Sequence, residues 1–209
     1  MAKKKTTSKG SVPANKQEKK KSGASRIITP EFKLSFPYIL RPDDNGKYGC
    51  AMIFSKAQLN ELKNLIYPLA EQVLRENKHN WSEKKMASVW NKAKPLTQFG
   101  LIKDGSDKEY NGYGEGTIFL TARTSMKPGV VDAALNEIDN AADLYPGCIC
   151  RASLTVFAYD NQGNQGLSLS LQNIQKVRDG EHLGNMVKAS DEFEAIDTGD
   201  DDDVDSMFD

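Results

Sequence analysis

The chain of 209 residues is poor in the side chains that most often carry catalysis. It has two histidines, His79 and His182, and neither has a neighbouring cysteine or a paired carboxylate. Three cysteines, Cys50, Cys148 and Cys150, lack the spacing of metal ligands or of a redox pair. We therefore expect buried free thiols in a reducing cytoplasm rather than a zinc site. The sequence predicts no catalytic, metal-binding or cofactor-binding residue, and thus a protein that is not an enzyme.

Long apolar runs are also missing. No stretch approaches the length that a membrane-spanning helix needs. The basic N-terminus is not followed by an apolar segment, which excludes a signal peptide. We expect a soluble, cytoplasmic protein that does not contact a membrane.

Two loop patterns resemble binding sites, but both are better interpreted as turns. Glycines at positions 112, 114 and 116 precede a predicted strand, whereas a dinucleotide-binding fingerprint follows a strand and opens a helix. We interpret them as turn residues. Four aspartates, at positions 43, 44, 104 and 107, also fit solvated turns better than a cation site.

Charge is present in abundance, but its two signs are separated. Residues 1–26 contain nine Lys or Arg and one Glu, whereas residues 191–209 contain ten acidic residues and no basic one. The charges between these ends nearly cancel. Both ends are too polar to bury enough apolar surface to offset their chain entropy. We predict a disordered Lys-rich arm (1–26), a folded domain (27–184) and a disordered acidic tail (185–209).

The middle of the chain reads as a mainly β domain with a helical insertion. Five strands are predicted, at 26–40, 47–55, 116–125, 147–163 and 166–177, and a short extra one at Val130–Val131. Between the second and third strands, leucines at helical spacing predict a helix that begins at Ser55, and a second helix is capped by Ser82. Pro68 is expected to kink the first helix. This order fits a small closed barrel or a sandwich.

Alternation along two strands separates an inner face from an outer face. From residue 148 to 158 the even positions are all apolar, while the odd positions include Arg151, Phe157 and Tyr159. In the strand 116–125, the outer positions include Phe119 and Arg123. Both outer faces therefore combine arginine, hydroxyl groups and aromatic rings.

Such a surface suits unpaired bases, because rings stack on bases and cations meet phosphates. Lys127, Lys176 and Arg178 add positive charge at the ends of the strands. An alternative remains open for Phe119 and Phe157, since the long helix of residues 56–78 would cover them in a simple core.

The charged ends fit the same function. A Lys-rich arm attracts phosphates without reading sequence. The acidic tail imitates a phosphate backbone and predicts occupation of the protein's own binding surface when DNA is absent. Its terminal Met-Phe-Asp provides an apolar anchor for a partner. The tail residues predicted to act in this way are Asp200, Asp201, Asp202, Asp203, Asp205 and Phe208.

The segment YPGCICRASLTVFAYDNQGNQGLSLSLQNIQKVRDGEHLG (145–184) resembles the single-stranded-DNA-binding proteins of tailed bacteriophages. A weaker similarity covers FPYILRPDDNGKYGCAMIFSK (36–56), and the acidic tail ending near Phe208 fits the same family. The resemblance implies a five-stranded oligonucleotide/oligosaccharide-binding (OB) barrel, with this chain's helices between strands two and three.

The resemblance further implies sequence-independent coating of single-stranded DNA in phage replication, recombination and repair, inside a bacterial host cell. It implies contacts of the tail with replication proteins such as DNA polymerase, and a homodimer. Arg151, Phe157 and Tyr159 are its carried-over DNA contacts. Two alternatives stay open: an RNA-binding module of the same fold, and a protein–protein adaptor whose acidic tail is a docking peptide. A metal-dependent hydrolase is disfavoured.

Overall fold

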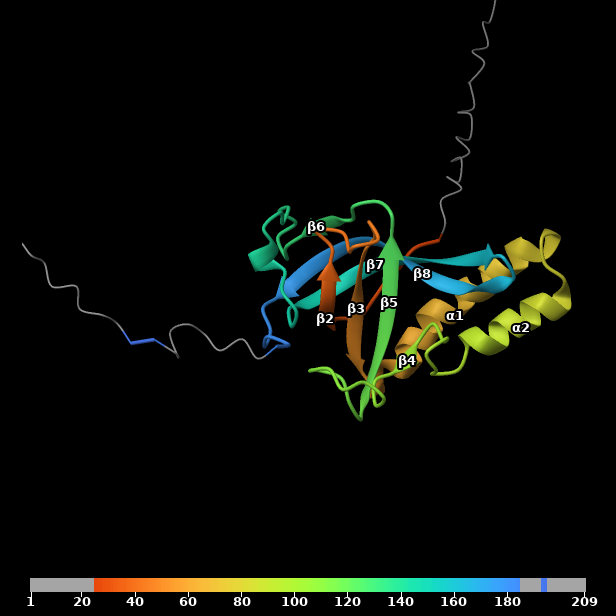
Figure 1. The fold of residues 1–209 in the computed structure, drawn as a ribbon, viewed down its shortest axis with the longest axis horizontal. Coiled ribbons are helices and arrows are strands. Elements are labelled where there is room, and N and C mark those ends of the chain that lie inside the picture. The colour runs from red at the N-terminus through yellow and green to blue at the C-terminus, as the bar shows by residue number, and fades with distance from the viewer. Residues whose placement is uncertain (1–24, 185–192, 195–209) are drawn as a thin grey trace, which may run out of the picture.

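The computed structural model describes residues 25–184 and 193–194. A ring of five strands forms its centre (Figure 1). β2 (Phe32–Tyr38) pairs with β3 (Tyr48–Ser55), β3 with β5 (Thr117–Thr124), and β5 with β8 (Asn164–Arg178). β8 pairs with β7 (Ile149–Asn161), and β7 returns to β2, which closes the ring. The predicted barrel is confirmed, and its strand order is that of an OB fold.

Only one contact in this ring is parallel. β5 and β8 pair in parallel through Ala122 and Leu169, while the other four pairings are antiparallel. The parallel contact closes the barrel because β7 and β8 form a long hairpin, which brings β8 back beside β5. The far part of this hairpin extends over the two helices (Figure 1).

Three short strands extend the sheet. β1 (Ile27–Ile28) pairs with β7, β4 (Lys103–Asp104) with β5, and β6 (Gly129–Val131) with β8. The strand predicted at Val130–Val131 is therefore confirmed. The single strand predicted over 26–40 is instead divided into β1 and β2 at Pro30, because proline lacks the N–H that a continuous ladder requires.

The helical insertion starts from a capping box. The Ser55 hydroxyl accepts a hydrogen bond from Ala57 N, and the Gln58 side chain accepts one from Ser55 N, which opens the 3-10 turn η1 (Lys56–Gln58). α1 (Leu59–Glu76) follows and runs through Pro68 without ending there. A further 3-10 turn, η2 (Asn77–His79), leads to α2.

α2 (Glu83–Ala93) is capped by Ser82, as predicted, since the Ser82 hydroxyl accepts from Lys85 N. α1 contacts β7 and α2 contacts β8, so the insertion packs beneath the β7–β8 hairpin. One more 3-10 turn, η3 (Ala141–Asp143), lies between β6 and β7.

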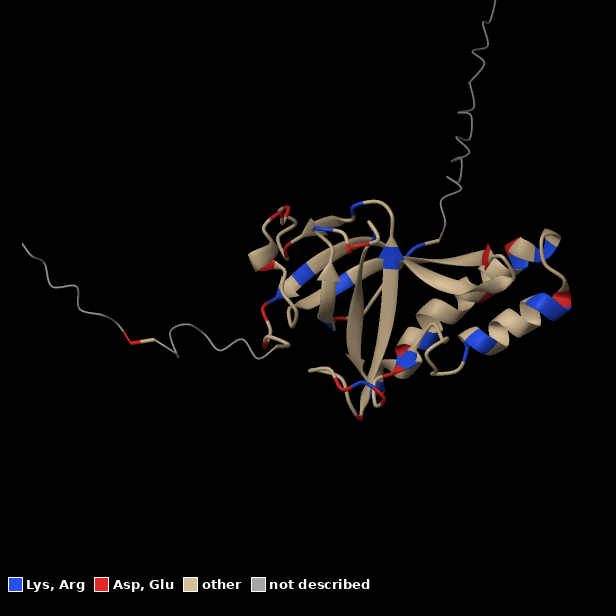
Figure 2. Cartoon of the chain, viewed as in Figure 1, with Lys and Arg blue, Asp and Glu red and all other residues tan. Residues whose placement is uncertain are grey.

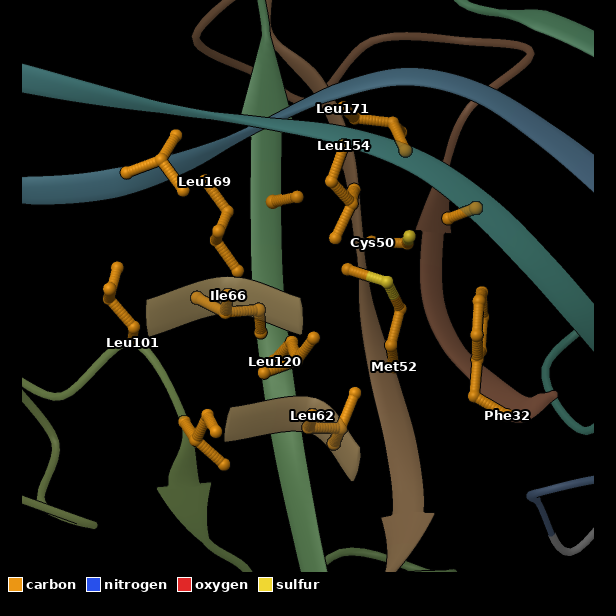
Figure 3. Close-up of a cluster of buried hydrophobic side chains, with 14 of the residues drawn as sticks. Phe32, Cys50, Met52, Leu62, Ile66, Leu101, Leu120, Leu154, Leu169 and Leu171 are labelled. Carbon is orange, nitrogen blue, oxygen red and sulfur yellow. The ribbon is translucent and has the colours of Figure 1, made fainter. Parts of the chain in front are cut away.

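The core fills the barrel interior and continues to the helices (Figure 3). Leu62 and Ile66 of α1 point toward Leu120 of β5 and Met52 of β3, and all four are fully buried. α1 therefore supplies part of the interior of the barrel, and the apolar face of this helix is buried there.

All three cysteines are free and buried, as predicted. Cys150 lies on the inner face of β7 and Cys148 lies just before that strand, while burial raises the pKa of Cys50 to about 12. A thiol with such a pKa stays protonated at neutral pH and is a poor nucleophile. Among the helices of the described part of the chain, none combines the length and apolar character that crossing a bilayer requires.

Candidate nucleic-acid interface

The alternation predicted for β7 is present in the structure. Its even positions from 150 to 156 are buried, while Arg151 and Phe157 are exposed on the outer face. α1 and α2 pack against the inner side of the hairpin, so the alternative in which a helix covers Phe157 is wrong.

Phe119 requires a correction. Its ring was predicted to be exposed, but only 6% of the residue is accessible. The cover is not the long helix: Lys103 of β4 pairs with Phe119 and places its Nζ atom 5.6 Å from the ring centre. On the same side, Tyr113 makes an edge contact at 5.2 Å. The loop after β4 folds back over β5, which strand alternation alone does not reveal.

A groove runs over the outer face of β5, and we call it the β5 groove. It consists of three adjoining hollows that share lining residues. The first and second share Thr121, and the second and third share Phe36 and Tyr38. The first hollow reaches α2 and the β7–β8 turn, and the third ends at Tyr110 and Leu183.

Exposed aromatic rings line this groove at both ends. Phe99 lies in the first hollow and is 70% exposed; Tyr159, also predicted as a site residue, lines the same hollow. Phe36, Tyr38 and Tyr110 lie at the other end, each more than 40% exposed. Aromatic rings are usually buried, so a set of exposed rings in one groove indicates a surface on which a ligand can stack.

The backbone of Phe36 is unusual. Its φ angle is +46°, in the left-handed region that a bulky residue rarely adopts, and it lies at a β-bulge between Ser35 and Tyr38. A bulge of this kind turns a side chain away from the regular alternation. Here the Phe36 ring meets Tyr110 edge-on at 5.3 Å. Such a conformation often marks a functional surface.

Cationic side chains also line the groove. Lys47 and Arg123 line the middle hollow, and Lys92 and Lys103 line the first. Arg123 lies 3.5 Å from Asp43, whose carboxylate offsets part of its charge. Basic segments on α2 and at one end of β5 are visible in Figure 2, whereas acidic segments gather in the loops around β6.

Lys103 is the best-placed cation in the groove. Its ammonium group donates a 2.7 Å hydrogen bond to the Thr121 hydroxyl, and it forms no ion pair with any acidic residue in the described range. Burial lowers its pKa, and the neighbouring positive charges of Lys108 and Arg123 lower it further. A phosphate bound beside Lys103 would favour the charged form of this lysine, because the two groups carry opposite charges.

The remaining predicted site residues are more widely distributed. Arg151 and Phe157 lie on β7, one strand away from the groove, and Ser168, the cross-strand partner of Phe157, lines the groove. Lys127 is exposed in the segment after β5. The predicted residues of the acidic tail, at positions 200–203, 205 and 208, lie outside the described residues.

Lys176 and Arg178 are not brought into the groove. They pair with Asp179 and Glu31, and they line a separate hollow that also contains Asp132 and Glu137. Their positive charges are offset there by carboxylates, which disfavours phosphate binding at that end of β8.

Sequence reasoning missed seven of the aromatic and cationic groove residues: Phe36, Tyr38, Lys47, Lys92, Phe99, Lys103 and Tyr110. The Phe-Pro-Tyr run at 36–38 and the Tyr-Asn-Gly-Tyr run at 110–113 were interpreted as strand and turn. Aromatic residues inside Pro- or Gly-rich segments were the available signal, since an ordinary turn has no need of such rings.

A closed five-stranded OB barrel with an open groove lined by aromatic rings and cations belongs to the class of single-stranded nucleic-acid-binding barrels. Comparison with known families agrees. Residues 25–205 match the family described as the ssDNA-binding protein of Enterobacter phage Enc34, and the chain belongs to this family. It is a family of DNA-binding proteins rather than enzymes, in agreement with the sequence prediction.

Individual relatives are more distant. A protein named p50, from Acyrthosiphon pisum secondary endosymbiont phage 1, is 27% identical over 183 residues, which cover 82% of this chain and 94% of the relative. The solved single-stranded DNA-binding protein of bacteriophage Enc34 is 21% identical, with a TM-score of 0.59 over 81% of this chain and 90% of that one.

The same Enc34 protein in complex with ssDNA is 22% identical, with a TM-score of 0.59 over 76% of this chain and 89% of that one. At these identities, the structural likeness establishes the fold.

Proposed function

We propose that this protein binds single-stranded DNA without sequence preference, with the strand lying along the β5 groove. One observation carries the proposal: exposed rings at both ends of the groove flank Lys103, a half-buried cation that has no carboxylate partner in the described part of the chain. Duplex DNA cannot use such rings, because its bases are stacked on one another.

Each part of the groove has a distinct role in this proposal. Phe36, Tyr38 and Tyr110 stack bases at one end, and Phe99 and Tyr159 stack bases at the other. In between, Arg123 and Lys103 neutralise phosphates. Stacking is tolerant of sequence because every base has a π-face, and each stacked base contributes about 1–3 kcal/mol.

A longer DNA strand has a path that continues beyond the groove. From the first hollow it would cross Ser168 and reach Phe157 and then Arg151 on the outer face of β7. Two of the three residues carried over from the family resemblance, Arg151 and Phe157, thus lie next to the groove, while the third, Tyr159, lines it.

We further infer a role in phage DNA replication, recombination and repair, supported by membership of a phage ssDNA-binding family. Within this role, the acidic residues of 191–209 compete with DNA for the cationic groove and recruit replication proteins. The charge of that segment supports the idea, since ten acids and no base imitate a phosphate backbone.

The test is binding of fluorescent oligonucleotides at two salt concentrations. We expect single-stranded DNA to bind much more tightly than duplex, with an affinity that falls steeply as salt rises. Equal affinity for both forms would contradict the proposal. Competition between oligo-dT and oligo-U separates DNA binding from the RNA-binding alternative, because the 2′-hydroxyl is the group that differs.

The adaptor alternative makes a different prediction. If the β-surface bound only proteins, replacing groove residues would leave DNA affinity unchanged. Tyr110→Ala and Lys103→Gln, each measured with the same oligonucleotide, therefore separate the two functions.

A further inference from the structure

The segment that leads into the acidic tail is built into one wall of the β5 groove. We call residues 179–184 the root segment, and residues 109–114, which carry Tyr110 and Tyr113, the aromatic loop. Leu183 lines the hollow that also contains Phe36 and Tyr110. The chain therefore leaves the described fold at the aromatic end of the groove.

Leu183 packs directly on the aromatic loop. Gly112 lies between the two tyrosines, at a φ of +85°, and a Cβ added there would lie 2.7 Å from the Cδ2 atom of Leu183. The same Cβ would lie 3.4 Å from the Cδ1 atom of Ile53 on β3. The backbone of the loop is thus held between Leu183 and the outer face of the barrel, with no room for a side chain.

The loop in turn places the stacking rings. Tyr110 makes an edge contact with Phe36, at 5.3 Å, and with Tyr113, at 6.2 Å. Tyr113 makes a further edge contact with Phe119 at 5.2 Å. Leu183 thus packs on a loop whose two tyrosines belong to a connected series of four rings: Phe36, Tyr110, Tyr113 and Phe119.

The root segment is itself fixed to the barrel by close contacts. Leu183 N donates to the carbonyl of Pro146 at 3.0 Å, and the His182 ring stacks on Tyr145 at 3.9 Å. The Tyr145 hydroxyl hydrogen-bonds to Asp179 and Gly180. These contacts make the root segment a rigid support.

We propose that Leu183 is a positioning residue for DNA binding: it holds the aromatic loop so that Tyr110 stays aimed into the groove. The inference rests on the proposed function, since it concerns the same groove. It also gives the acidic segment a physical link to the site, because the chain that begins after Gly184 is attached to the support of the loop.

The experiment compares Leu183→Ala in the full-length chain with the wild type. We expect the Kd for single-stranded DNA to rise about fivefold, less than the rise caused by Tyr110→Ala, since loss of position removes only part of one stacking contact. Leu183→Met, which restores packing volume, is expected to bind like the wild type. Leu135→Ala, which removes an exposed leucine far from this loop, is the matched control.

A second measurement separates positioning from a general structural effect. In a Tyr110→Ala background, Leu183→Ala should cause little further loss, because the ring that it positions is gone. The same factor in both backgrounds, or no effect in the wild-type background, would overturn the proposal.

Hydrogen exchange tests the contact without DNA. Leu183→Ala should speed exchange of the amides at 109–114 and leave the β7–β8 hairpin unchanged. Unchanged exchange at 109–114 would overturn the inference. If the wild-type chain failed to bind single-stranded DNA, the proposed function would fall, while this readout would still decide whether Leu183 holds the loop.

Discussion

The ammonium group of Lys103 lies 5.6 Å from the centre of the Phe119 ring, above a residue that strand alternation had placed in solvent. This pair shows how the outer face of β5 can bury an aromatic ring and still present a cation to the groove. Phe119 supports the lysine from below, and Thr121 accepts its hydrogen bond, so the charge is held at one point of the groove. A flexible surface lysine would lose more side-chain entropy on meeting a phosphate.

Replacing Lys103 should therefore weaken DNA binding and flatten its salt dependence. For Lys103→Gln we expect the slope of log K against log salt to become shallower by about 0.7, the value for one phosphate contact on a single strand. Titrations at four salt concentrations measure this slope. Lys78→Gln, which removes an exposed lysine outside the groove lining, is the control. An unchanged slope in Lys103→Gln would show that no phosphate binds there.

The pH dependence provides a separate test of the same residue. Burial and the charges of Lys108 and Arg123 lower the pKa of Lys103 below that of an ordinary exposed lysine. As pH rises through this lowered pKa, the lysine loses its proton and its attraction for phosphate. We expect affinity for oligo-dA to decline at a lower pH in the wild type than in Lys103→Arg, whose guanidinium stays charged. Coincident profiles would contradict this assignment.

The aromatic residues of the groove should contribute more to DNA affinity than Phe157, which lies on β7 beside the groove. Tyr110→Ala and Phe99→Ala are each expected to weaken binding about 5- to 150-fold, which corresponds to the loss of one stacked base. Phe157→Ala should have little effect on an oligonucleotide just long enough to fill the groove, and a larger one on a longer strand that crosses Ser168. Anisotropy titrations with a series of lengths decide this. A length-independent loss in Phe157→Ala would instead place Phe157 in the central site.

Removal of the acidic tail should strengthen DNA binding. Deleting residues 197–209 removes seven aspartates, and we expect a lower Kd, most clearly at low salt, where charge competition is least screened. A full-length variant with these aspartates replaced by asparagine separates charge from length. If the deletion weakened binding, the competition model would be wrong.

Ser55→Ala tests the helical insertion independently of DNA. Because the Ser55 side chain caps η1, the turn from which α1 continues, through the capping box, its loss should lower the free energy of unfolding by about 1 kcal/mol. Urea denaturation measures the change, and DNA affinity should stay the same. Ser88→Ala, an exposed position inside α2, is the control and should not destabilise the protein. A change in DNA affinity for Ser55→Ala would show that the helices contribute directly to binding.

Local physical rules were sufficient to predict the barrel strands and both helices. The alternation along β7 follows from the period of a strand, and Ser55 and Ser82 cap their helices because few residues can satisfy the free amides there. The cysteines were correctly predicted to be buried. Cys148 and Cys150 belong to the same apolar set of even positions as Ala152.

Long-range packing decided the rest. Whether Phe119 is exposed depends on β4 and Tyr113 folding back onto β5, and no local pattern encodes that contact. The groove combines Phe36, Phe99 and Tyr110 from separate segments, and β5 pairs with β8 only when the barrel closes. The sequence by itself determined the strands, the helices and the separation of charge, because these depend on neighbouring residues. Only the tertiary structure decided which rings face a ligand, because exposure is set by segments that meet across the fold.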